Sequence, residues 1–137
     1  MKKILFPLMV SALALQSCGE TALPDPNPQG SNGLDIQINI NNSPYTALKQ
    51  VGGSAIISAE KIIVARYQAS SWSAVQSTCP SDASVNLSYN HGDLTYRCSK
   101  DNSVYGIDGK AKSGSTTNLK VYNKSFSENN GVLRIFE

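Results

Sequence analysis

Two short segments that alternate apolar and polar residues, 85–89 and 94–98, constrain the fold of this chain most. A side-chain period of two is typical of a β-strand with one buried face. The four residues between the segments have the composition of a turn, and Gly92 is free to adopt a positive φ angle. The pattern predicts a β-hairpin, which would bring the polar loops after Cys79 and Cys98 close together.

The rest of the chain after residue 33 also consists of short apolar runs separated by turns. Residues 45–51 are compatible with either a helical turn or a loop, and residues 128–131 have a hairpin-turn composition. No long segment has a helical period, so we expect one all-β domain with antiparallel sheets over residues 34–137. Further strands are expected at residues 34–40, 55–57, 61–67, 72–79, 119–122 and 132–136.

The N-terminal segment has the features of a bacterial lipoprotein leader. Lys2 and Lys3 precede an apolar run that is too short to cross a bilayer, so residues 1–17 are expected to be a signal peptide. The run ends in Leu-Gln-Ser-Cys, which resembles a lipobox and implies cleavage before Cys18 and lipidation of its thiol. The alternative is that this thiol is incidental. Residues 18–33, rich in Pro, Gly, Ser and Asn, are expected to be a tether.

The charge balance gives no indication of a polyanionic partner. The formal charge is +2, but removal of Lys2 and Lys3 with the leader leaves ten basic residues against ten acidic ones. A neutral domain without charged blocks is not expected to bind nucleic acid. The expected partners are the lipid membrane, through the N-terminal anchor, and a protein that the sequence does not identify.

The region from residue 79 to residue 109 resembles the two cluster-binding boxes of Rieske iron–sulfur domains. In that family the boxes are Cys-x-His and Cys-x-x-His-Gly-Ser-x-Phe/Tyr, followed by Asp-Gly. Cys79 and Cys98 match the two cysteines, and the later positions of the second box match at Ser103, Tyr105, Asp108 and Gly109. The resemblance extends over roughly residues 34–136 and implies a Rieske-like fold of antiparallel sheets.

The two histidine positions of the boxes do not match. Ser81 stands at the first and Asp101 at the second, and Asn102 replaces the usual glycine. In a Rieske centre two imidazoles hold the second iron, and a hydroxyl with one carboxylate does not replace them. The only histidine, His91, is expected in the hairpin turn. The resemblance therefore implies a degenerate site, and no cofactor or metal is expected.

The resemblance also suggests what the two cysteines do without a cluster. In the family both thiolates bind one iron, so Cys79 and Cys98 should lie close enough for a disulfide in an oxidising compartment. A redox-active disulfide is possible in principle, although no Cys-x-x-Cys motif supports it. Without a cluster, Ser103 is expected to be a loop hydroxyl and Tyr105 a core aromatic.

Three readings of the function follow. The first is an exported, membrane-anchored lipoprotein of the bacterial cell envelope, favouring the outer membrane, with a non-catalytic binding or assembly role. The second is an electron-transfer protein that binds [2Fe–2S] through Cys79 and Cys98 with Ser81 and Asp101 at the histidine positions. The third is a thiol–disulfide redox protein. No catalytic residues are expected in the first reading, which we adopt as the main expectation.

Overall fold

The computed structural model describes residues 33–137, which belong to one compact unit. The expected signal peptide (1–17), the lipidation site Cys18 and all of the expected tether except its last residue lie outside the described residues. Those three expectations therefore stay predictions. Within residues 33–137, no helix is both long enough and apolar enough to cross a membrane.

The fold is all-β with antiparallel pairing throughout the described residues, as the sequence predicted. One short 3-10 helix, η1 (Thr46–Lys49), occupies the segment that the sequence left ambiguous. The strands are β1 (Asp35–Asn39), β2 (Ser54–Ile57), β3 (Ile62–Gln68), β4 (Ser71–Gln76), β5 (Thr78–Cys79), β6 (Asp82–Asn90), β7 (Thr95–Cys98), β8 (Val104–Gly106), β9 (Ala111–Ser113), β10 (Asn123–Ser127) and β11 (Val132–Phe136).

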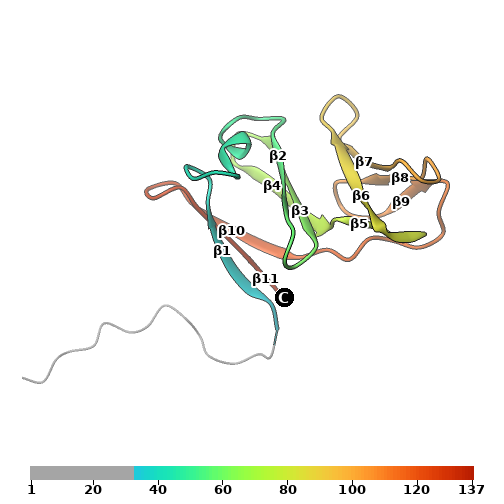
Figure 1. Cartoon of the computed structure of the whole chain (residues 1–137). Coiled ribbons are helices and arrows are strands. Elements are labelled where there is room, and N and C mark those ends of the chain that lie inside the picture. Colours follow the sequence, from blue (N-terminus) through green and yellow to red (C-terminus); the bar gives the residue numbers. More distant parts are fainter. Residues whose placement is uncertain (1–32) are drawn as a thin grey trace, which may run out of the picture. The chain divides into compact units, whose positions relative to one another are not determined.

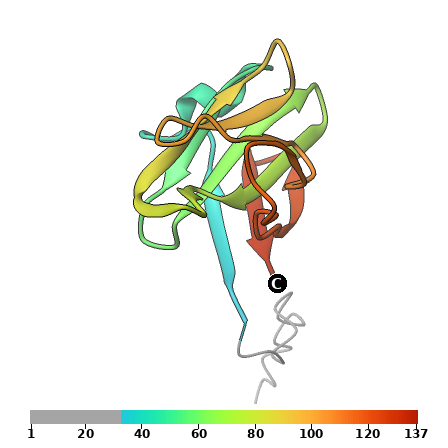
Figure 2. The same cartoon turned by 90° about the vertical axis from the view of Figure 1, so that its right-hand side faces the viewer.

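The strands form three sheets. Two have three strands each, in the orders β1-β11-β10 and β2-β3-β4, and the third has five in the order β5-β6-β7-β8-β9. Figure 1 shows the two smaller sheets together and the five-stranded sheet projecting to one side. The end of the chain lies beside the start of the described residues, because the Glu137 amide donates to the Leu34 carbonyl at 3.0 Å. Figure 2 shows the C-terminus beside the start of β1.

Two separate apolar clusters hold the sheets together. The first joins the two three-stranded sheets and includes Trp72, Leu133 and Ile135. The second lies under the five-stranded sheet and includes Cys79, Cys98, Leu87, Tyr96 and Tyr105. Strand β3 contributes to both clusters, because Ile62 and Val64 face the first while Ile63 and Ala65 face the second. A strand buried on both faces accounts for the continuous apolar run that the sequence shows here.

One expected strand, residues 72–79, is divided in the structure. It forms β4 and β5, and Ser77 lies between them. The Ser77 amide donates to Lys61 at 2.7 Å, whereas its carbonyl accepts from Leu87 in β6 at 2.6 Å. Here the chain passes from one sheet to the next, so no single strand can contain both halves.

Two further expectations about the backbone were wrong. Residues 119–122 form only an isolated bridge, Val75 to Val121. Lys120 and Tyr122 bond to β4 on either side of it, but the Leu119 amide donates to the Gly109 carbonyl instead, so the pairing does not continue. The positive φ angle expected at Gly92 occurs instead at Leu94, with φ 52°. The structure also contains three strands that we did not expect: β8, β9 and β10. In β10 only Phe126 is partly buried.

Candidate functional site

Cys79 and Cys98 meet at the base of two loops of the five-stranded sheet. Cys79 ends β5 and Cys98 ends β7, and both side chains are buried. The structure places their sulfur atoms at disulfide distance, 2.17 Å, with 5.6 Å between the Cα atoms, as the resemblance suggested. The hairpin of β6 and β7 produces this approach, because Leu87 pairs with Cys98 while the start of β6 pairs with β5.

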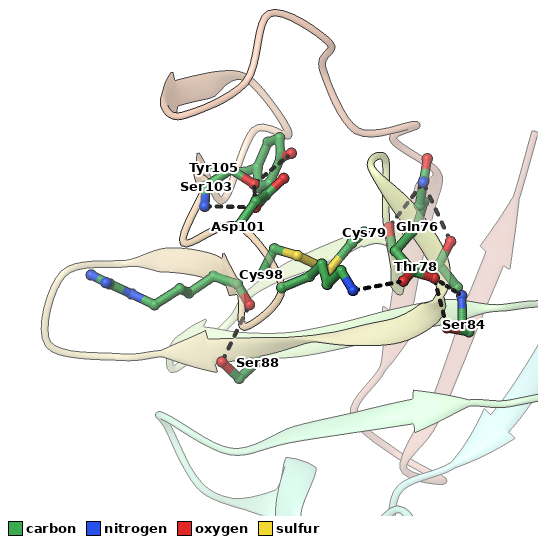
Figure 3. The surroundings of a disulfide bond; sticks show 12 residues. Gln76, Thr78, Cys79, Ser84, Ser88, Cys98, Asp101, Ser103 and Tyr105 are labelled. Carbon is green, nitrogen blue, oxygen red and sulfur yellow. Dashed lines mark hydrogen bonds and ion pairs between the residues drawn. A yellow bond between two sulfur atoms is a disulfide. The ribbon is translucent and has the colours of Figure 1, made fainter.

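The loop after Cys98 is organised around the carboxylate of Asp101. The amide and the hydroxyl of Ser103 both donate to Asp101 Oδ1, at 2.9 and 2.5 Å, and the Ser103 Oγ lies 3.1 Å from the Tyr105 hydroxyl. Figure 3 shows these three side chains together on one side of the disulfide. Ser103 and Tyr105 are fully buried, so Tyr105 is a core aromatic as expected. Ser103 was expected to be a loop hydroxyl, but its side chain is buried and hydrogen-bonds to Asp101 and Tyr105.

Hydrogen bonds fix the charge of Asp101. Donation from the Ser103 hydroxyl, with smaller effects from the Ser81 hydroxyl and the Ser103 amide, lowers the pKa of Asp101 to about 2. Hydrogen bonds to the ionised form stabilise that form, whereas desolvation opposes it only weakly here. Asp101 is therefore an anion at every pH at which the protein is expected to work.

The residues at the former histidine positions do not fit a Rieske cluster. Ser81 offers a neutral hydroxyl, and Asp101 Oδ1 already accepts two hydrogen bonds from Ser103. His91 lies in the turn between β6 and β7, where its Nδ1 is 3.2 Å from the Tyr89 hydroxyl. Among residues 33–137, no three His, Cys, Asp or Glu side chains are grouped so that they could hold a metal ion. The donor set of the second iron is missing from the loops.

An open depression with a volume of about 560 Å³, called the cavity below, lies at the tips of the loops. Three chain segments contribute its walls: the residues after β5, the loop after β7, and the segment after β9. The lining residues are Pro80, Ser81, Asp101, Gly114, Ser115, Thr116 and Thr117. Ser81 and Asp101, which the sequence analysis singled out as former ligand positions, thus face one shared space.

The third wall of the cavity was not expected from the sequence. Gly114 has a φ of +74°, and a Cβ atom there would lie 2.9 Å from the Cα of Ser103. Ser115 then closes a local turn, since its Oγ accepts from the Thr117 amide at 3.1 Å. The available signal was the run Ser-Gly-Ser-Thr-Thr at residues 113–117, whose composition is typical of a tight polar loop.

Comparisons with solved structures identify the fold. The chain is similar to the ferredoxin of carbazole 1,9a-dioxygenase from Nocardioides aromaticivorans, with a TM-score of 0.51 and 11% identity over 63% of this chain and 86% of that one. It is also similar to a structure named as an NADH-dependent nitrite reductase small subunit from Mycobacterium tuberculosis. That match has a TM-score of 0.52 and 11% identity over 78% of this chain and 97% of that one.

The fold is Rieske-like. At this level of identity the likeness shows the fold and nothing about activity. No protein-family model matches the sequence, and a comparison with curated protein sequences also gives no match. The Rieske-like fold expected from Cys79, Cys98 and the second box is thus supported by the structural neighbours, while the chemistry of the loops has to be argued from this chain's own residues.

Proposed function

We propose that this chain is a lipid-anchored protein of the bacterial envelope whose Rieske-like domain carries no iron–sulfur cluster and acts by binding. The observation that carries the proposal is the disulfide between Cys79 and Cys98. A cluster needs both sulfurs as thiolates, and a disulfide removes both from the ligand set. Ser81 and Asp101 supply no imidazole in their place.

A structural role of the disulfide agrees with its surroundings. Both cysteines are at most 1% exposed and lie in the apolar cluster with Leu87, Tyr96 and Tyr105. Thiol–disulfide exchange requires access of an attacking thiolate to one of the sulfurs. This burial favours a bond that stabilises the loops over one that reacts, and it gives no support to a thiol–disulfide redox protein.

Electron transfer is the second candidate. It is favoured by the name of one structural neighbour, a ferredoxin, and by the position of the two cysteines within a single pair of loops. In this reading the disulfide would be reduced, and Cys79 and Cys98 would hold one iron of a [2Fe–2S] cluster. Asp101 and Ser81 would then have to serve the second iron.

Anaerobic purification with iron, sulfide and free-thiol assays separates these candidates. We expect no stoichiometric iron or acid-labile sulfide, no visible absorption band, and no free thiol in the domain spanning residues 34–137. A known Rieske ferredoxin, purified in parallel, is the positive control. Two irons and two sulfides per chain would establish the electron-transfer reading and refute the proposal. Two rapidly alkylated thiols without iron would favour thiol–disulfide chemistry instead.

The membrane anchor is tested separately, through Cys18. We expect Cys18→Ala to abolish incorporation of labelled fatty acid and to leave the precursor unprocessed or free of the membrane. Cys79→Ala is the matched control, because that cysteine lies inside the folded domain and should leave lipidation unchanged. A Cys18→Ala protein that matures and stays in the membrane fraction would contradict the anchor.

A further inference from the structure

The cavity at the loop tips has a chemistry of its own, and this inference rests on the proposed absence of a cluster. We propose that the cavity lined by Ser81, Asp101 and the segment 114–117 is a binding site for a primary ammonium group. The group would belong either to a small amine or to a lysine side chain of a partner protein. Its recognition would depend on one fixed carboxylate surrounded by hydroxyl oxygens.

The walls of the cavity are held by covalent and short-range interactions. The disulfide connects the loop that carries Pro80 and Ser81 to the loop that carries Asp101. Gly114 lies against the backbone of Ser103, where no side chain would fit. A site whose walls are fixed before binding loses little conformational entropy when a ligand enters.

The charge of the lining is a single negative one. Asp101 is the only charged residue that lines the cavity. Its Oδ1 accepts both Ser103 bonds, and the Ser81 hydroxyl also donates to this carboxylate. The nearest cation in the sequence, Lys100, lies 3.8 Å from the carboxylate of Asp82, so the two charges of that pair offset each other. The lining therefore favours a ligand with one positive charge.

The hydrogen-bonding groups of the lining select the type of cation. An ammonium group offers three donors and no acceptor. Four lining side chains carry hydroxyl oxygens that can accept, and none carries a nitrogen or an aromatic ring: Ser81, Ser115, Thr116 and Thr117. A quaternary ammonium would need an aromatic cage, and a calcium ion would need several carboxylates. A primary ammonium needs neither.

The cavity is larger than an ammonium group, so it leaves room for a larger polar ligand that carries the ammonium. A volume of about 560 Å³ exceeds that of an ammonium group alone and lies within the range of small-molecule sites. Glucosamine and Nα-acetyl-lysine amide present the same ammonium group on a polyol and on a lysine side chain. Comparing the two probes distinguishes a small amine from a partner protein as the source.

Titration of ¹⁵N-labelled domain, followed by amide chemical shifts, tests the proposal. We expect saturable shifts confined to residues near Ser81, Asp101 and 114–117, with a Kd of about 1–10 mM for the tighter probe. Glucose and Nα,Nε-diacetyl-lysine amide, which lack the ammonium, should produce none of these shifts. The probe that binds at least about fivefold more tightly identifies the source, and equal binding would support the ammonium site common to both.

Three variants show whether binding depends on the lining. Asp101→Asn keeps an oxygen acceptor for the Ser103 amide but removes the charge, so affinity should fall about tenfold or more. Thr116→Val removes one hydroxyl that makes no hydrogen bond within the described residues and should weaken binding about two- to fivefold. Glu128→Gln, an equal charge change in the turn before β11, should have no effect.

The outcomes of this titration are separable from those of the iron assay. Absence of saturable shifts with both probes, or identical affinity in Asp101→Asn and wild type, would overturn the ammonium site while leaving the cluster-free domain intact. Shifts of equal size with glucose would also overturn it. If Asp101→Asn does not fold, Thr116→Val and the neutral probes still decide the question.

Discussion

Removal of the disulfide should unfold the five-stranded sheet before the rest of the domain. The perturbation is the double variant Cys79→Ala/Cys98→Ala, which leaves no unpaired thiol. The two cysteines are 19 residues apart. The chain-entropy relation for a loop of this length gives about 3 kcal/mol of stabilisation, within the 2–4 kcal/mol typical of native disulfides.

The effect should be local as well as large. Both cysteines belong to the cluster with Leu87, Tyr96 and Tyr105, whereas the other cluster contains neither of them. Loss of the bond should therefore accelerate amide hydrogen exchange in β6, β7 and β8 more than in β1 and β11. The smaller sheets keep their own buried contacts and are expected to stay folded in the variant.

Urea unfolding with hydrogen-exchange mass spectrometry measures both quantities. With an m-value of about 1.5 kcal/mol/M, a loss of about 3 kcal/mol moves the midpoint by about 2 M urea. Wild-type protein treated with a reductant that reaches buried disulfides should approach the variant. An unchanged midpoint would refute the stabilising role, and an equal loss of protection in all sheets would refute the division into two clusters.

Two further predictions concern the loops. Gly114→Ala should lower the free energy of unfolding by about 1–3 kcal/mol, because Gly114 has a φ of +74° and the new Cβ would lie 2.9 Å from the Ser103 Cα. The control Gly92→Ala, at a glycine without positive φ, should change the free energy of unfolding by less than about 0.5 kcal/mol in the same denaturant assay. The pKa of Asp101 is lowered to about 2 from 3.8, so its contribution to stability is present above pH 3.8 and is lost as the pH falls toward 2. Asp101→Asn should reduce the acid dependence of unfolding in that window, and an unaltered pH profile would contradict this.

The sequence predicted the parts of the fold that local patterns determine. The alternation in residues 85–89 and 94–98 and the turn between them correctly identified the hairpin of β6 and β7. Strands β1, β3 and β11 were also expected at nearly their observed positions. In each case one buried face or a doubly buried strand leaves a readable apolar pattern.

The failures occur where distant segments determine the local conformation. Ser77 ends β4 because its two backbone groups bond to different sheets, which no window of sequence reveals. Residues 119–122 have a strand-like composition, but they pair with β4 only in one isolated bridge, through hydrogen bonds at Lys120 and Tyr122. The wall formed by Gly114 depends on its approach to Ser103, a tertiary contact. The sequence analysis therefore singled out two residues of the cavity, Ser81 and Asp101, as the positions of the missing histidines, but it did not predict the cavity itself.

The double role of β3 has a consequence for how this domain can change. Ile62 and Val64 face one cluster and Ile63 and Ala65 the other, and the adjacent strand β4 divides in the same way at Ala74 and Val75, so these two strands separate the two clusters. Substitutions in the loops that follow Cys79 and Cys98 touch only one side of these two strands. New ligand chemistry can therefore be selected, or engineered, at the loop tips without repacking the side of β3 that faces β1 and β11. A shift in the backbone of β3 or β4, in contrast, would disturb both clusters at once.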